Sequence, residues 1–192
     1  MYLLNSAIKI MAIFVGISKI DAAKRELEHS IRLFFSQGDI VVIHLVACSS
    51  YSILTGLGKT MGVGSMREEL LTRVRKDKIR YVQRKLDEPF NFFKHALRDP
   101  NDILKFSPES SEFVIWDSIN IYQKITKEIT GLMMSFRLWF YLKNSELLLK
   151  TEEKEYFKEA GNKIDINDRS FFLQAAEIFE NKRTNRSISG SY

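Results

Sequence analysis

The chain has 192 residues, a length that suits one well-packed domain and is too short for two comfortable ones. With 45% hydrophobic residues but only nine Gly and three Pro, it can fill a large apolar core yet lacks the turn residues of a β-sandwich or barrel. The net charge of +5 mildly favours binding to polyanions. It is too small for a dedicated DNA-packaging protein, which is strongly basic.

The first 17 residues are predicted to form an apolar N-terminal extension. The apolar run at 10–17 is interrupted by Gly16 and is shorter than the roughly 20 residues that a membrane span needs. No small-residue cleavage site of a signal peptide follows it. We expect a packed or frayed extension, with a targeting segment as the alternative reading. Met11 is an alternative start, which would leave 1–10 outside the native protein.

The first helix is expected to start at Ser18 and to end at Gly38, because apolar residues recur at helical spacing between them. Asp39 can cap a second helix over about 40–57. This helix is apolar on most sides, so we expect it to lie buried in the centre of the fold. Four glycines between 56 and 64 predict a loop after it.

Ser65 and Glu68 form a capping-box pattern that opens a long charged helix, predicted to run to about Glu88. Pro89 suits a first helical turn, so 89–97 is either a new short helix or a kinked continuation. A loop with two prolines is expected over 98–107.

The second half of the chain is also expected to be helical, with Gly131 dividing two long segments. The predicted helices are 108–130, 131–141, 152–160 and 168–181. The sequence therefore predicts an all-α, single-domain bundle of about six to eight helices over 18–182, dimeric through an apolar face. A polar, Ser-rich segment at 183–192 predicts a disordered tail.

Several kinds of site are poorly supported. Gly58-Lys59-Thr60 resembles a phosphate-binding loop, but the earlier glycine of that pattern is Ile53 here. The three histidines lie far apart without a metal-ligand pattern, so we expect no metal and no cofactor. His44 and Cys48 fall on the apolar helix, where a core histidine and an inert thiol are the expected roles. The single cysteine excludes an intramolecular disulfide and favours a reducing, cytoplasmic location.

The segment from 67 to 85 carries eight basic residues against three acidic ones. Four of the basic residues step by three or four, which would stack them along one helical face: Arg73, Lys76, Arg80 and Arg84. Such a face can follow the phosphates of a nucleic acid, and Lys94 adds charge beyond it. The alternative is an ordinary solvated helix face.

Asn91 and His95 are four residues apart and would share a helical face in the segment Pro89 to Pro100. His95 is a candidate general acid or base because the pKa of histidine lies near neutrality. Lys94 and Arg98 add positive charge beside it, which favours the neutral imidazole. The alternative is a histidine that caps or packs an interhelical contact.

Five short stretches carry a resemblance: Lys19-Ile-Asp-Ala-Ala, Ile31-Arg-Leu-Phe-Phe, Gly38-Asp39, Ile43-His44 and Asn91-Phe-Phe-Lys-His95. Over about residues 18–108 the chain resembles a family of uncharacterised bacterial helical proteins that has no established activity.

Asn91-x-x-x-His95 also resembles, more distantly, the second part of the Arg-Asn-x-x-x-His motif of HEPN domains. These are helical bundles, and many are metal-independent ribonucleases or toxins whose site forms across a dimer. The resemblance implies that His95 performs acid–base chemistry and that Asn91 orients the site. The motif arginine is replaced by Phe90, so Arg84 or Arg98 would have to hold the phosphate.

These patterns lead to two expectations. The first is an HEPN-like homodimer that binds or processes RNA without metal, in a defence or toxin–antitoxin setting and away from membranes. The second is a non-catalytic helical module whose basic face binds an acidic protein or a nucleic-acid backbone. The lost motif arginine favours the second expectation. A small-molecule enzyme is a third class, but no carboxylate pair or metal set supports it.

Overall fold

The computed structural model describes residues 14–95 and 100–189, and every element within these ranges is helical. The elements are α1 (Lys19–Phe35), α2 (Ile40–Thr60), α3 (Met66–Thr72), η1 (Lys76–Lys78), α4 (Ile79–Lys94), α5 (Glu109–Thr126), α6 (Gly131–Lys143), η2 (Ser145–Leu147), α7 (Thr151–Gly161) and α8 (Arg169–Ser189). The prediction of an all-α bundle is confirmed. Most of the predicted N-terminal extension, 1–13, lies outside the described residues, and Phe14 beside it is exposed.

Three helix starts form as the capping patterns predict. The Ser18 hydroxyl accepts a hydrogen bond from the Asp21 backbone N–H at 3.1 Å. Asp39 accepts from the first amides of α2 at 2.9 and 3.0 Å. Ser65 and Glu68 form the reciprocal capping box at the start of α3. Each cap satisfies backbone N–H groups that have no partner within the helix.

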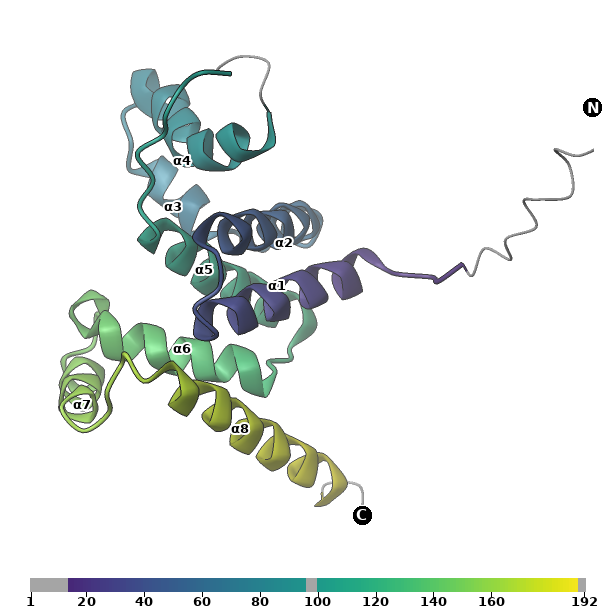
Figure 1. Cartoon of the computed structure of the whole chain (residues 1–192), viewed down its shortest axis with the longest axis vertical. Coiled ribbons are helices and arrows are strands. Elements are labelled where there is room, and N and C mark those ends of the chain that lie inside the picture. Colours follow the sequence, from purple (N-terminus) through teal and green to yellow (C-terminus); the bar gives the residue numbers. More distant parts are fainter. Residues whose placement is uncertain (1–13, 96–99, 190–192) are drawn as a thin grey trace, which may run out of the picture.

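The core of the bundle lies between α1, α2, α5, α6 and α8. Helix α2 packs between α1 and α5, and α6 lies alongside α8 (Figure 1). Aromatic rings join α1 to α6 and α8. The Phe35 ring stacks on Phe172 with centroids 5.5 Å apart, and Phe34 meets Trp139 edge to face at 4.6 Å. Trp139 is 1% exposed, so this seam is a dry, well-packed part of the core.

Helices α6 and α8 approach closely where α6 begins. A Cβ atom at Gly131 would lie 2.2 Å from the Ala176 carbonyl oxygen, so only glycine fits there. The Gly131 N–H donates to a Glu180 carboxylate oxygen at 2.6 Å. The Ser135 hydroxyl donates to the Phe172 carbonyl in a short hydrogen bond. The glycine at the predicted boundary therefore serves helix packing as well as the chain turn.

The elements α3, η1 and α4 form a separate layer, which we call the arm. In Figure 1 the arm lies at the opposite end of the molecule from α6 and α8. None of its three elements contains a buried residue. The arm contacts the bundle mainly through α2. Its side chains are therefore available for recognition in a way that those of the bundle are not.

Among the described helices, α2 alone is long and apolar enough to pass a composition test for a membrane span. A core helix passes the same test. Helix α2 packs on α1, α4 and α5, and seven of its residues are buried. The helix therefore contributes one face to the core, but it is not buried on most sides as its composition predicts, since Ile40 and Val42 near its start are exposed.

Two boundaries differ from those predicted. Helix α2 continues to Thr60, so Gly56 and Gly58 are helical instead of belonging to a loop. Gly58 is buried against the Val63 carbonyl, and the contact offsets the poor helix propensity of glycine. At the C-terminus α8 runs to Ser189, so residues 183–189 continue a helix where a disordered tail is predicted.

The prediction of one long charged helix from Ser65 to Glu88 is wrong. Helix α3 ends at Thr72, and the chain passes through η1 before α4 starts at Ile79. Residues 73–78 contain four Lys or Arg residues besides Val74 and Asp77. A continuous helix would stack those like charges at neighbouring turns, with Val74 as the only apolar side chain of the stretch to bury. Helix α4 then continues through Pro89, which resolves the two readings of that proline.

Candidate nucleic-acid interface

The break at 73–78 changes the predicted basic stripe. Arg73 caps the C-terminal end of α3, and its guanidinium pairs with Glu69 at 2.8 Å. Lys76 lies in η1. Arg80 and Arg84 remain four residues apart on α4, and so share a face. The prediction of one helical stripe is therefore wrong, and the four cations belong to three elements: the end of α3, η1 and α4.

Ion pairing divides the eight basic residues of this segment into two groups of four. The paired group is Arg67 with Asp87, Arg73 with Glu69, Arg75 with Asp77 and Lys85 with Glu88. The other four residues are exposed and form no ion pair within the described residues. We call them the basic surface: Lys76, Lys78, Arg80 and Arg84.

An exposed aromatic ring lies beside the basic surface. Tyr81 on α4 is 53% exposed, and the Arg84 guanidinium carbon lies 5.8 Å from its ring centroid. An exposed tyrosine between cations gives a base a face to stack on while the cations bind phosphates. The sequence prediction missed Tyr81 and Lys78, since both fall off the assumed stripe.

Asn91 and His95 lie at the end of α4, and both are exposed. His95 has left the helical conformation (φ −132°, ψ 116°), and its backbone N–H donates to the Asn91 carbonyl at 3.0 Å. Neither side chain forms a hydrogen bond or ion pair with the described part of the chain. Lys94 lies 4.4 Å above the Phe90 ring. Arg98 lies outside the described residues, so its place beside His95 stays a prediction.

The Asn-Phe-Phe-Lys-His turn is anchored through one of its phenylalanines, Phe93. The Phe93 ring meets Phe106 at 5.2 Å and His44 of α2 at 6.0 Å, both edge to face. Phe106 in turn lies 4.8 Å from His44. The end of α4 is thereby held against α2 while Asn91 and His95 face outward.

His44 is a buried core histidine and Cys48 a buried thiol, as the sequence predicts. His44 is 2% exposed; its Nδ1 lies 3.0 Å from the Ser111 hydroxyl and its Nε2 lies 3.4 Å from the Cys48 sulfur. Burial lowers the pKa of His44 to about 4 and raises the pKa of Cys48 to about 12. Both groups are therefore neutral near pH 7, and neither is an activated nucleophile or base.

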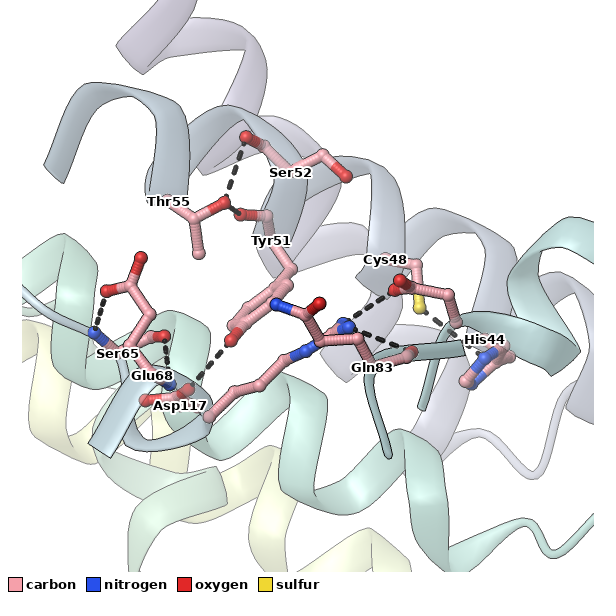
Figure 2. A network of polar contacts seen from close by, with 11 residues as sticks. His44, Cys48, Tyr51, Ser52, Thr55, Ser65, Glu68, Gln83 and Asp117 are labelled. Carbon is pink, nitrogen blue, oxygen red and sulfur yellow. Dashed lines mark hydrogen bonds and ion pairs between the residues drawn. The ribbon is translucent and has the colours of Figure 1, made fainter. Parts of the chain in front are cut away.

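A second polar cluster attaches the arm to α5 (Figure 2). Both carboxylate oxygens of Asp117 accept from the Met66 N–H, at 3.0 and 3.1 Å, and one also accepts from the Tyr51 hydroxyl at 3.1 Å. Burial raises the pKa of the Asp117 carboxyl and of the Tyr51 hydroxyl. The available signal for this buried carboxylate was an acidic residue within the mainly apolar stretch 113–122 of α5.

The two halves of the arm are joined to each other by Arg67. Its Nη1 donates to Asp87 at 2.6 Å, and its Nη2 donates to the Gln83 carbonyl at 3.2 Å. The hydrogen bond to Asp87 raises the pKa of Arg67. Arg67 therefore serves to hold α3 on α4 instead of contributing to the basic surface.

No group of three or more His, Cys, Asp or Glu side chains in the described ranges is arranged to hold a metal ion. The Gly58-Lys59-Thr60 stretch forms the last turn of α2, so it is not a phosphate-binding loop. No family model, curated protein or solved structure matches the chain.

Proposed function

We propose that this protein binds single-stranded RNA through the basic surface and Tyr81. One observation carries the proposal: four exposed cations without acidic partners among the described residues lie on η1 and the first turns of α4, and one of them, Arg84, lies 5.8 Å from the ring of the exposed Tyr81. The other four cations of the segment are already paired with carboxylates, which lowers what they can add to phosphate binding. The resemblance to HEPN domains at Asn91 and His95 supports RNA as the polyanion.

Phosphate binding by these residues has a measurable signature. Each cation that contacts a phosphate releases counterions, and single strands give a slope of about −0.7 per contact in log K against log salt. Four contacts thus predict a slope of about −3. Stacking of one base on Tyr81 adds roughly 1–3 kcal/mol and favours a single strand over a duplex, in which base faces are covered.

The test is fluorescence anisotropy with a labelled single-stranded RNA at several salt concentrations. The target variant replaces the basic surface with glutamine: Lys76→Gln, Lys78→Gln, Arg80→Gln and Arg84→Gln. The control removes the same charge from four other exposed cations: Lys19→Gln, Arg25→Gln, Arg32→Gln and Lys182→Gln. We expect the target variant to lose at least about a hundredfold in affinity and most of its salt slope.

Equal losses in the target and control variants would contradict a defined site and show binding by net charge alone. Tyr81→Leu should cost about tenfold for single-stranded RNA and little for duplex RNA, because leucine keeps apolar bulk but offers no ring. Equal competition by polyglutamate at matched charge would favour an acidic protein as the partner.

Metal-independent RNA cleavage is a second candidate. Asn91 follows Arg80 by 11 residues, close to three helical turns, so it faces the same side of α4 as the basic surface. His95 follows directly at the end of the helix and could act on a bound strand. The test incubates labelled RNA with the protein and a chelator, beside His95→Ala and the exposed control His29→Ala. Cleavage lost only in His95→Ala supports the enzyme, and no cleavage by the unaltered protein refutes it.

A further inference from the structure

A cavity of about 690 Å³ lies where the arm crosses the bundle. Helix α2 forms its floor, and α3, α4 and α5 form its walls. Cys48, Tyr51 and Thr55 belong to the floor and Gln83 and Asp117 to the walls, and Figure 2 shows the Tyr51 hydroxyl directed at Asp117. Half of the fourteen remaining lining residues are apolar: Met66, Leu70, Leu71, Leu86, Phe90, Phe113 and Val114.

The depth of the cavity distinguishes it from a flat surface patch. Cys48 on the floor is only 8% exposed, whereas Leu70 and Leu86 at the mouth are 47% and 44% exposed. Side chains from four helices, α2, α3, α4 and α5, line it. The volume falls within the roughly 300–1,000 Å³ typical of small-molecule sites.

The charged groups of the wall are paired with one another. Arg67 pairs with Asp87 at 2.6 Å, and Lys59 lies 3.8 Å from Glu68. Asp117 carries a further carboxylate, already bonded to Tyr51 and the Met66 N–H. The wall thus holds three carboxylates and two cations, which disfavours an anion. Because two of the carboxylates are paired and the third is saturated with donors, a cation also finds no free partner.

The lining carries hydrogen-bonding groups besides its ion pairs, among them the side chains of Gln83 and Ser110 and the free N–H groups of Arg67. A guanidinium has five N–H donors, and Arg67 uses one toward Asp87 and one toward the Gln83 carbonyl. The Cys48 thiol adds a weak donor on the floor. An oxygen acceptor on a ligand could use these donors without carrying charge.

We propose that this cavity binds a neutral, mainly apolar small molecule, aromatic or aliphatic, that carries a carbonyl or hydroxyl oxygen. The apolar walls bury its body, and an Arg67 N–H donates to its oxygen. The site lies under the arm and uses none of the basic surface, so it is independent of RNA binding.

The first experiment titrates the full chain with prodan, a neutral naphthalene ketone whose emission shifts to the blue in apolar surroundings. We expect saturable binding with a blue shift. The anionic naphthalene 1-anilinonaphthalene-8-sulfonate should bind at least about tenfold more weakly, because its sulfonate would face the surplus carboxylate of the wall. No saturable prodan binding, or tighter binding of the sulfonate, would overturn the proposal.

Two blocking variants locate the binding. Leu71→Trp fills the cavity from α3, and Ser52→Trp fills it from the exposed edge of α2, where the fold tolerates bulk. The matched control is Leu149→Trp, since Leu149 is fully exposed far from the cavity. Prodan binding should be lost in both blocked variants and kept in the control, with circular dichroism melts showing that each is folded. Retained binding in folded Ser52→Trp would place the probe elsewhere.

A further variant tests the hydrogen bond. Arg67→Met combined with Asp87→Leu removes both members of the pair, so no unpaired carboxylate remains. Prodan should then bind about tenfold more weakly, whereas N-phenyl-1-naphthylamine, which has no carbonyl, should be unaffected. Equal changes for both probes would remove the role of Arg67. A dimer that dissociates when prodan binds would show instead that a second copy covers this face.

Discussion

The bundle and the arm differ in what holds them. The bundle buries large side chains such as Trp139 and Phe136, both at most 1% exposed. The arm buries no residue, and it is attached to the bundle by a few contacts, chiefly those of Asp117 with the Met66 N–H and of the Phe93 ring with His44. The difference indicates that most of the folding free energy comes from the bundle. Substitutions on the surface of the arm therefore cost little stability, and its exposed side chains are available for binding.

The largest expected effect separates the two regions directly. Trp139→Ala should lower the free energy of unfolding by about 3–5 kcal/mol, because it opens a cavity in the aromatic seam. Tyr81→Ala in the arm should change it by no more than about 0.5 kcal/mol. Urea unfolding followed by circular dichroism measures both. Similar losses in the two variants would contradict the division.

Close helix packing in the bundle gives the second effect. Gly131→Ala should cost about 3 kcal/mol, since the new methyl group would meet the backbone of α8 at 2.2 Å. Gly56→Ala on α2 is the control, because a Cβ there meets nothing within 4 Å. The control should stabilise the protein by roughly 0.5–1 kcal/mol through helix propensity. If Gly131→Ala stabilised the protein as Gly56→Ala is expected to do, α6 and α8 would lie further apart than the contact at Gly131 indicates.

The buried histidine makes stability depend on pH. The pKa of His44 is about 4 in the folded protein against 6.5 when unperturbed, so the unfolded chain binds the extra proton between these values. Stability is therefore fully present above pH 6.5 and falls with acidification, by about 2 kcal/mol between pH 7 and pH 5.

The measurement for His44 compares unfolding free energies across pH for the unaltered protein, His44→Gln and the exposed control His29→Gln. The His44 variant should lose this slope, and the control should keep it. Burial raises the pKa of Asp117 and Glu112, which acts with the opposite sign, but both carboxyls are present in all three proteins and cancel in the comparison. An unchanged slope in His44→Gln would mean that the imidazole is charged when folded.

The smallest expected effect lies within the arm. A double-mutant cycle on Arg67 and Asp87 should give a coupling of up to about 1 kcal/mol, because the Arg67 side chain is only 26% exposed. The same cycle on Arg75 and Asp77, whose side chains are 80% and 56% exposed, should give almost none. Equal couplings would show that Arg67 does not hold α3 on α4.

The helical bundle was predictable because its determinants are local. Caps at Ser18 and Asp39 and the apolar spacing of the first helix are encoded within a few residues of where they act. The prediction of one long helix after Ser65 was wrong because it, too, used only local patterns. Periodicity continues across 73–78, but it does not register the repulsion of stacked like charges.

The candidate interface was only partly predictable. Which cations stay free depends on partners such as Asp87 and Glu88, whose positions follow from the break in the helix. The hydrogen bond from the Met66 N–H to Asp117 joins residues that are 51 positions apart in the sequence, so no local sequence pattern could predict it. The sequence therefore predicted the basic segment, but not which of its cations form ion pairs and which form the basic surface.

Cys48 gives the molecule a chemical reporter. It is the one cysteine of the chain, and it lies 8% exposed beneath the arm, in contact with His44. Its sulfur lies on the floor of the cavity, so a thiol reagent small enough to enter the cavity can reach it while the arm stays in place. A molecule that fills the cavity blocks this approach, so the rate of the thiol reaction reports how much of the cavity is occupied.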